Sequence, residues 1–152
     1  MKEVLLVEDN PADVYLIQRA VADCGSDIHL SVMPDGGEAL TFLRQEAPFP
    51  HVPAPTLIAL DLRLPRINGD QILPDVRRLP AYQTTPIVVL SAASKEEAEA
   101  RCLQFGATAY VQKSANFYAY VDAIKDIVCR WLKPEGLSES RPVGSGFRGN
   151  RC

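Results

Sequence analysis

Along this chain, two hydrophobic patterns alternate from the N-terminus to about residue 132. The first is a short run in which nearly every residue is apolar and Val, Ile and Leu dominate. Such runs are typical of parallel β-strands that are buried on both faces of a sheet. Five of them predict strands at Val4–Val7, Ile28–Val32, Leu57–Leu60, Ile87–Leu90 and Thr108–Val111.

The second pattern is an apolar stripe at helical spacing, with residues three or four positions apart. The stripes predict five helices, and the residues at their ends agree. Asn10 can cap the first helix with Pro11 at its first position, Ser94 and Glu97 form a capping box, and Gly106 can end the fourth helix. The stripe residues are Val14, Ile17, Val21 and Cys24; Ala39, Leu40 and Leu43; Ile72, Val76 and Leu79; Ala98, Cys102 and Phe105; and Phe117, Tyr120, Val121, Ile124, Ile127, Val128 and Trp131.

Strands that alternate with helices predict an α/β fold with one parallel sheet, helices on both faces and right-handed connections. Pro74 is expected near the first turn of the third helix, where proline disturbs a helix least. The proline-rich stretch 46–55 predicts a stiff surface loop. The folded domain is predicted to span residues 1–132. Residues 133–152 are polar and rich in Gly, Ser and Arg, and we expect them to form a flexible tail.

The composition argues against several classes of protein. A chain of 152 residues is long enough for one domain with a real core, and its net charge of −3 argues against a role in binding nucleic acid. No apolar run has the length of a membrane span and the N-terminus does not resemble a secretory signal, so we expect a cytoplasmic protein without membrane contact. The four cysteines lack a metal-binding spacing, and we expect reduced, mostly buried thiols without disulfides.

The carboxyl ends of four predicted strands carry side chains that can take part in chemistry. Glu8 and Asp9 follow the first strand, Asp61 the third, Ser91 the fourth, and Lys113 lies just past the fifth. In an open parallel sheet, ligands bind outside the carboxyl ends of the strands. A single such residue would be an ordinary cap or surface group, but the convergence of all five at one edge predicts a functional site.

The residue types of this set indicate a particular chemistry. Three carboxylates in one place repel one another and require a cation. Mg²⁺ suits them, because it takes oxygen ligands and binds through one or two carboxylates plus a phosphate. A carboxylate can act as a nucleophile and form an acyl phosphate, while Lys113 neutralises phosphoryl oxygens and Ser91 donates a hydrogen bond. The set therefore predicts magnesium-dependent phosphoryl transfer to a carboxylate.

Four segments, "VLLVEDNPAD", "ALDLRLPRINGDQIL", "PIVVLSA" and "FGATAYVQKS", resemble the motifs of the response-regulator receiver domain of two-component signalling. They occur in the family's order, and the resemblance covers about residues 2–132. It implies a flavodoxin-like (βα)5 fold with strand order 2-1-3-4-5. It also implies a switch that is phosphorylated by a sensor histidine kinase and that catalyses its own phosphorylation and dephosphorylation, rather than a metabolic enzyme.

The resemblance also implies a role for each site residue. Asp61 corresponds to the phosphoacceptor and Lys113 to the lysine of the family's site. Asp9 corresponds to a direct Mg²⁺ ligand, Glu8 to one that acts through water, and the backbone carbonyl of Arg63 to a third protein ligand. Two residues correspond to the family's conformational switch, namely Ser91 and the aromatic Tyr110, which turns inward on activation.

Some features narrow the resemblance. The lysine is followed by Ser114 where most receivers have proline, so the loop after it is expected to differ. The "KSAN" stretch, the extended region between the second and third strands, and the "WL" ending of the last helix are together similar to single-domain receivers that pair with bacterial phytochromes. The kinase partner implied is therefore a bacteriophytochrome. Arg63 is bulky and cationic beside the site, and we expect it to affect the lifetime of the phosphoryl group.

Signal output is expected to occur by protein contact, because the 20 residues after Leu132 are too few for a DNA-binding output domain. In the family, the face made by the fourth helix, fifth strand and fifth helix changes on phosphorylation. We therefore predict a homodimer through this face. Among its aromatic residues we expect Tyr120 and Trp131 to pack in the core, and Tyr118 to be an exposed contact.

Three other functions compete with this interpretation. A pseudo-receiver that binds partners without phosphorylation is disfavoured by the intact acids and Lys113. An aspartyl phosphohydrolase would carry an acid two residues after its nucleophile, where this chain has Arg63, and would need a cap domain. A flavin carrier of the same fold would need a phosphate-binding loop after the first strand, whereas "EDNPAD" repels phosphate unless a metal is bound.

Overall fold

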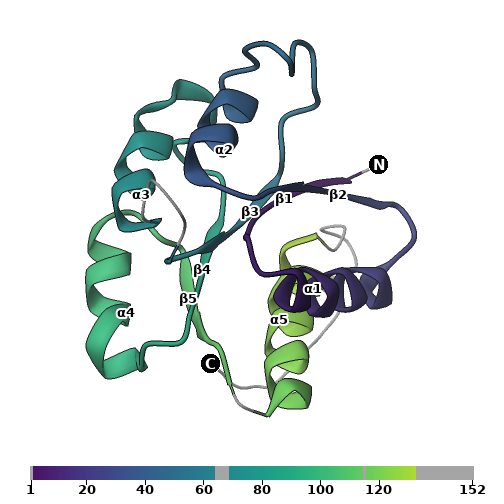
Figure 1. Cartoon of the computed structure of the whole chain (residues 1–152), viewed down its shortest axis with the longest axis vertical. Helices are drawn as coiled ribbons and strands as arrows, with labels where there is room; N and C mark the ends of the chain where they lie inside the picture. Colours follow the sequence, from purple (N-terminus) through teal and green to yellow (C-terminus); the bar gives the residue numbers. More distant parts are fainter. Residues whose placement is uncertain (1, 64–68, 115, 133–152) are drawn as a thin grey trace, which may run out of the picture.

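A computed structural model describes residues 2–63, 69–114 and 116–132 (Figure 1). Five parallel strands form one sheet in the order β2-β1-β3-β4-β5, so the predicted α/β receiver topology is confirmed. The elements are β1 (Lys2–Val7), α1 (Pro11–Cys24), β2 (Ile28–Met33), α2 (Gly36–Leu43), β3 (Leu57–Asp61), α3 (Gly69–Arg78), the short 3₁₀-helix η1 (Pro80–Tyr82), β4 (Ile87–Ser91), α4 (Lys95–Gln104), β5 (Ala109–Gln112) and α5 (Phe117–Leu132).

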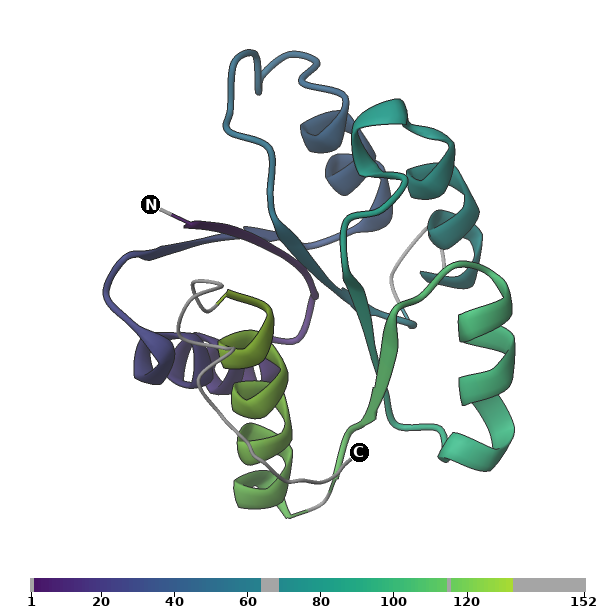
Figure 2. The same cartoon turned by 180° about the vertical axis from the view of Figure 1, so that it is seen from behind.

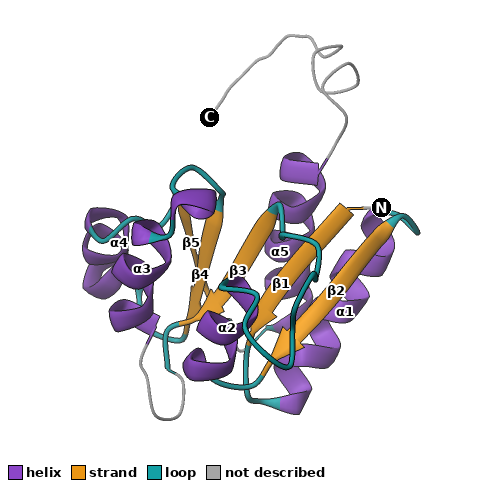
Figure 3. Cartoon of the chain, turned by 90° about the horizontal axis from the view of Figure 1, so that it is seen from above, coloured by secondary structure: helices purple, strands orange, loops and turns teal. Residues whose placement is uncertain are grey.

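Helices cover both faces of the sheet, as Figures 2 and 3 show. On one face, the strand side chains Leu6 and Leu57 pack in a cluster with Ile17 of α1 and Ile124 of α5. A second cluster on the other face joins the strands to α2, α3, α4 and η1. Because β3 and β4 are buried along their whole length, the continuous apolar runs in the sequence are explained by burial on both sides.

The register of the sheet brings the carboxyl ends of the central strands to one edge. Asp61, the last residue of β3, pairs with Leu90, and Ser91, the last residue of β4, pairs with Gln112. Figure 3 shows the strands pointing in the same direction toward this edge. The loops that follow the strands therefore share one end of the molecule.

The predicted helix ends are confirmed where the cap residues are described. The Asn10 side chain accepts a hydrogen bond from the Ala12 amide, and Ser94 and Glu97 form the reciprocal capping box of α4. Gly106 has a φ of 114°, in the left-handed region that favours glycine, and it directly follows the C-cap of α4.

Several predicted boundaries and positions were wrong. The fifth strand is Ala109–Gln112, one residue later than predicted. The Thr108 amide donates to the Ile87 carbonyl at 2.7 Å, but the Ile87 amide donates back to the Thr108 hydroxyl at 3.0 Å, so a side chain makes part of the pairing here. Pro74 lies well inside α3 rather than in its first turn, so α3 loses an internal hydrogen bond that its buried apolar residues must offset. Leu79 follows α3 and Phe105 caps α4, so both lie beyond the helices whose stripes they were assigned to.

The proline-rich loop is not wholly at the surface. Phe49 and Val52 pack against the core, and the Phe49 ring meets Phe42 of α2 edge-on, with ring centroids 5.3 Å apart. The loop thus closes one end of the apolar cluster between the sheet and α2.

The aromatic residues of α5 divide between core and surface. Tyr120 is buried as predicted. Tyr118 is 75% exposed, which confirms its predicted exposure, while its role as a contact stays a prediction. Trp131 is 44% exposed, so its predicted core position was wrong. It lies in the last turn of α5, where Val128 and Leu132 are the buried side chains, so Trp131 is on the outward side of the helix.

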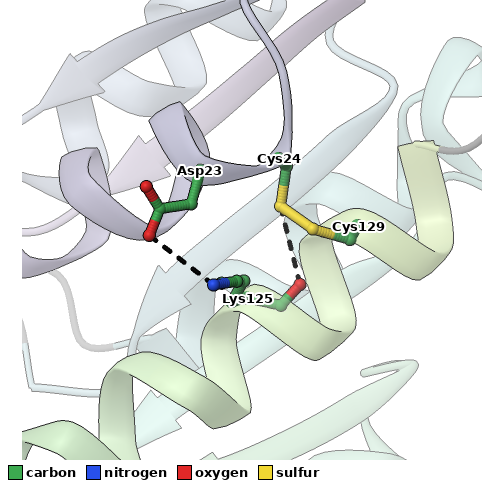
Figure 4. The surroundings of a disulfide bond; sticks show 4 residues. All are labelled: Asp23, Cys24, Lys125 and Cys129. Atoms are coloured by element: carbon green, nitrogen blue, oxygen red, sulfur yellow. Dashed lines mark hydrogen bonds and ion pairs between the residues drawn. A yellow bond between two sulfur atoms is a disulfide. The ribbon is translucent and has the colours of Figure 1, made fainter.

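The prediction that all cysteines are reduced thiols was also wrong. Cys24, the last residue of α1, and Cys129 of α5 form a disulfide with their Cα atoms 5.3 Å apart (Figure 4). The two residues are separated by 105 positions, so their spacing in the sequence does not predict the pair. They meet because α1 and α5 lie side by side on the same face of the sheet. The predicted tail, residues 133–152 with Cys152, lies outside the described residues.

Among the described residues, every helix is too short or too polar to span a bilayer.

Arg77 of α3 links three backbone segments. Its guanidinium donates hydrogen bonds to the carbonyls of Tyr82 at 2.7 Å, Thr85 at 2.7 Å and Gly106 at 2.9 Å. These carbonyls belong to η1, the loop before β4 and the turn after α4. Burial lowers the pKa of Arg77, which is the cost of placing a cation in this position.

We expect Arg77→Ala to lower the free energy of unfolding by about 2–4 kcal/mol, because it leaves these carbonyls without their charged donor. Urea unfolding followed by far-ultraviolet circular dichroism measures the change. The neighbouring Arg78 is the matched control, since it is exposed and, within the described part of the chain, its ion pair is with Asp75. Arg78→Ala should cost less than about 1 kcal/mol, and equal losses in the two variants would contradict the role assigned to Arg77.

Candidate functional site

All five residues predicted from the strand ends come together at the carboxyl edge of the sheet. Glu8 directly follows β1, Asp61 ends β3 and Ser91 ends β4, and all three are buried. Lys113 directly follows β5, and its amide donates to the Ser91 carbonyl at 2.6 Å. Asp9 is exposed at the rim. Buried acids are costly unless they are paired, so this edge is built for binding rather than for stability.

The three acids form a group that can hold a metal ion. One carboxylate oxygen each from Glu8, Asp9 and Asp61 lie within 4.8 Å of one another. The donors are all oxygen, two are buried and one is open to solvent, which fits a hard divalent cation that keeps some of its waters. The residues present therefore fit Mg²⁺, as predicted.

Lys113 lies among the carboxylates. Its Nζ is 2.9 Å from Asp13 Oδ2, 3.1 Å from Glu8 Oε1 and 3.4 Å from Asp61 Oδ2. Burial pushes the pKa of Lys113 down, but the hydrogen bond to Asp13 and the charges of Glu8 and Asp61 outweigh it and raise the pKa above its ordinary value. The ammonium is therefore charged throughout the physiological range and stands beside Asp61.

Glu8 is the acid whose ionised form is disfavoured by its surroundings. Burial, followed by its hydrogen bond and charge repulsion with Asp61, raises the pKa of Glu8 from its ordinary value of 4.5 to about 7, against the opposing effect of Lys113. The Asn10 amide donates to Glu8 Oε2 at 3.2 Å. Without a cation, the site therefore has more negative charge than Lys113 neutralises.

The Asp61 carboxylate is oriented by the chain that follows it. The Arg63 amide donates to Asp61 Oδ1 at 3.0 Å, and the other oxygen, Oδ2, faces Lys113. The Arg63 side chain is exposed. Its carbonyl as a metal ligand stays a prediction, and the following residues 64–68 lie outside the described part of the chain.

The two predicted switch residues are connected through one loop. The Ser91 hydroxyl accepts a hydrogen bond from the Ala93 amide at 3.1 Å, and the Tyr110 hydroxyl donates to the Ala93 carbonyl. Tyr110 is already turned inward and buried in this structure. A change at Ser91 would therefore reach Tyr110 through the backbone of Ala93, although their roles as a switch remain a prediction.

Asp13 was missed by the sequence analysis. It lies in the first turn of α1 and is the nearest carboxylate to Lys113. The signal was present in "EDNPAD", because a helix capped by Asn10 directs its first turn back toward the acids that precede it. Acidic residues are common in the first turn of a helix because of the helix dipole, so the position of Asp13 in the sequence does not by itself indicate a contact with Lys113.

Tyr120 was assigned to the core, but its hydroxyl also belongs to the surroundings of the site. Among the described residues this buried oxygen has no hydrogen-bond partner. Burial raises the pKa of Tyr120, and the charges of Asp13, Glu8 and Asp61 raise it further. The hydroxyl therefore remains protonated and lies within the electrostatic field of the acids.

We expect Asp13→Asn to lower the free energy of unfolding of the metal-free protein by about 1–2 kcal/mol, because the partly buried Lys113 loses its closest charged partner. Asp23→Asn in the same helix is the matched control, since the Asp23–Lys125 pair is 3.6 Å apart and about half exposed. That variant should change stability by less than about 0.5 kcal/mol. Thermal unfolding in the presence of a chelator measures both changes. An Asp13→Asn variant with native stability would contradict a stabilising role for the Asp13–Lys113 ion pair.

Comparisons with known proteins agree on one family. The family described as "Response regulator receiver domain" matches residues 4–125. Response regulator Rcp1 of Synechocystis sp. is 32% identical over 132 residues, which are 87% of this chain and 90% of that protein. The phosphorylated cyanobacterial phytochrome response regulator RcpA is similar in structure, with a TM-score of 0.81, 36% identity, and coverage of 86% of this chain and 94% of its own. The Mn²⁺-bound form of Rcp1 has a TM-score of 0.80 at 32% identity, covering 88% and 96%.

Proposed function

Because the chain belongs to the response-regulator receiver family, we propose that Asp61 accepts a phosphoryl group from the phosphohistidine of a sensor histidine kinase. The observation that carries this proposal is the position of Asp61 between a cation and a cation site. Its Oδ2 lies 3.4 Å from Lys113 Nζ, and its carboxylate shares the acid group with Glu8 and Asp9. This position between Lys113 and the acid group suits a carboxylate that receives a negatively charged group.

In the proposed reaction, an Asp61 carboxylate oxygen attacks the phosphorus, the P–N bond to the kinase histidine breaks, and an acyl phosphate forms on Asp61. Mg²⁺ bound by the acids would neutralise charge on the phosphoryl oxygens. Lys113 is placed to neutralise a further phosphoryl oxygen, and Ser91 to donate a hydrogen bond after turning its hydroxyl from the Ala93 amide. The protein then acts as a switch, and its catalysis is confined to its own phosphorylation and dephosphorylation.

The alternative of a pseudo-receiver is not favoured. Such a protein needs no cation site, whereas Glu8, Asp9, Asp61 and Lys113 form a complete set at one edge of the sheet. Keeping Glu8 buried costs stability, and a module that only binds partners would gain nothing from it.

The test is the intact mass of the protein after incubation with acetyl phosphate and Mg²⁺. The native chain should gain one adduct of about 80 Da, and the adduct should be absent with a chelator and in Asp61→Asn. Asp75→Asn on α3, whose carboxylate pairs with Arg78 at 2.6 Å outside the site, is the matched control and should keep the adduct. An adduct that survives in Asp61→Asn would show that another residue is the acceptor.

We propose further that the kinase is a bacterial phytochrome and that the protein works in the cytoplasm. The support is the similarity to RcpA, described as a cyanobacterial phytochrome response regulator, and to the bacteriophytochrome response regulator RtBRR, with 33% identity and a TM-score of 0.70. Phosphotransfer from a phytochrome kinase should be at least 10-fold faster than from a histidine kinase of a different input class. Equal rates would contradict this partner.

The proposed output is a homodimer through the face of α4, β5 and α5. Of the six large hydrophobic side chains exposed in the described residues, five lie on α4, the turn after it, or α5, beside the edge strand β5. They are Leu103, Phe105, Phe117, Tyr118 and Trp131. Sedimentation velocity at tens of micromolar should show a dimer with a phosphoryl mimic, and Tyr118→Ser should weaken it. A monomer in every condition would contradict the proposal.

A further inference from the structure

The disulfide lies at the opposite end of the α1–α5 pair from the acid site. α1 begins at Pro11, two residues after Asp9, carries Asp13 in its first turn, and ends at Cys24. With 14 residues, this helix separates its two ends by about 20 Å. Figure 4 shows the bond joining the last turn of α1 to α5. The two sulfurs are therefore chemically independent of the phosphoryl site, although both ends share the same helices.

Contacts other than the disulfide also hold the two cysteines near each other. Asp23, next to Cys24, forms an ion pair with Lys125, one helical turn before Cys129, at 3.6 Å. The packing of Ile17, Ile124 and Val128 in one apolar cluster also holds the helices together. The two thiols of a reduced protein would thus stay close, and the ring closure is intramolecular at high effective concentration.

The surroundings of Cys24 offer a partner for a thiol as well as for a disulfide. Cys24 Sγ lies 3.6 Å from the carbonyl oxygen of Lys125 (Figure 4). A sulfur in a disulfide has no proton to donate, so this contact becomes a hydrogen bond only when Cys24 is a thiol. Both cysteines are only partly buried, which leaves the sulfurs within reach of small thiols and disulfides.

We propose that Cys24 and Cys129 form a reversible thiol–disulfide site that exchanges with low-molecular-weight disulfides of the glutathione class and clamps α5 to α1. In the oxidising direction, one protein thiolate attacks the small disulfide, forms a mixed disulfide and releases one small thiol. The second protein thiolate then attacks the protein sulfur of the mixed disulfide and releases the second small thiol. The two protein thiols are oxidised to one disulfide, one small disulfide is reduced to two thiols, and the protons of the protein thiols end on the released thiols.

The clamp should act on the C-terminal half of α5 and leave the acid site unchanged. It closes a loop of more than a hundred residues, so the disulfide form should unfold roughly 5–10 °C above the dithiol form. Because Cys24 lies at the far end of α1 from the acid site, the rate of phosphoryl incorporation should differ less than about 2-fold between the two forms. This readout separates the clamp from the proposed phosphorylation, since either can fail without the other.

The test uses the native chain equilibrated in buffers with increasing ratios of reduced to oxidised glutathione. Thiols are trapped with iodoacetamide and located by peptide mass. We expect Cys24 and Cys129 to change together, from disulfide in oxidised glutathione to alkylated in millimolar reduced glutathione, and to return when the ratio is reversed. A pair that stays disulfide in reduced glutathione alone, or stays dithiol in oxidised glutathione alone, would overturn the proposal. So would a stable glutathione adduct on one cysteine without ring closure.

Melting temperature gives a second readout that does not depend on trapping. The native chain should lose roughly 5–10 °C on reduction, whereas the Cys24→Ser, Cys129→Ser double variant should melt like the reduced native protein in both buffers. Cys102→Ala, which alters a cysteine buried in α4, is the control and should keep the redox-dependent shift. An equal shift in the double variant would place the redox sensitivity elsewhere and overturn the assignment.

Discussion

Lys113→Ala should slow phosphoryl incorporation at Asp61 by about 100-fold or more and, at the same time, destabilise the metal-free protein. The first effect follows because Lys113 Nζ, 3.4 Å from Asp61 Oδ2, is placed where the charge of a transferred phosphoryl group develops. Removing one such preorganised donor typically costs a factor of 100 to about 1,000 in rate. Initial rates of adduct formation with acetyl phosphate at saturating Mg²⁺ measure this effect.

The second effect follows from the same contacts. Without Lys113, Glu8, Asp13 and Asp61 lose their shared cation, and breaking a largely buried charge pair costs about 3–5 kcal/mol. Mg²⁺ should restore more stability to the variant than to the native chain, because it replaces the missing positive charge. Lys125→Ala is the matched control, since its pair with Asp23 is about half exposed. If Lys113→Ala is phosphorylated at the native rate, the lysine has no part in the transfer.

Glu8→Gln should weaken Mg²⁺ binding by about 10- to 100-fold and yet raise the melting temperature of the metal-free protein at pH 8. The loss of affinity follows because Glu8 supplies one of three carboxylates whose oxygens lie within 4.8 Å of one another. The gain in stability follows because burial and Asp61 raise the pKa of Glu8 to about 7, so the fold favours its neutral form.

The pH dependence has a definite sign. The folded-state pKa of Glu8 lies above its ordinary value of 4.5, so between about pH 4.5 and 7 the folded metal-free protein binds more protons than the unfolded chain. Its stability therefore falls as the pH rises through this window, and Glu8→Gln should remove much of the fall. Melting curves with a chelator at several pH values and calorimetric titration with Mg²⁺ measure the two effects.

Glu3→Gln, at the other end of β1, is the control for Glu8→Gln, because Glu3 pairs with His29 away from the site. It should leave Mg²⁺ affinity unchanged. A Glu8→Gln variant with native Mg²⁺ affinity would remove Glu8 from the metal site.

Much of the site was predictable because of the topology. Once the five apolar runs were assigned to parallel strands, the rule that their carboxyl ends meet placed Glu8, Asp61, Ser91 and Lys113 together. Asp13 was not predicted as a site residue, because its role depends on the position of the long Lys113 side chain in the folded protein. Tyr120 was assigned correctly to the core, but only the packing of α5 shows its hydroxyl near the acids.

By itself, the sequence determined the order of elements, the parallel sheet and the residues at the strand ends, because hydrophobic periodicity and caps are local signals along the chain. The strand order 2-1-3-4-5 was implied by the resemblance to the receiver family. Tertiary structure decided the contacts that join distant residues. The Cys24–Cys129 bond spans 105 positions, and the Arg77 hydrogen bonds reach residues up to 31 positions away. It also decided that Trp131 lies on the outward side of α5. Such pairings depend on how the helices pack against the sheet, and local residue patterns along the chain do not predict this packing.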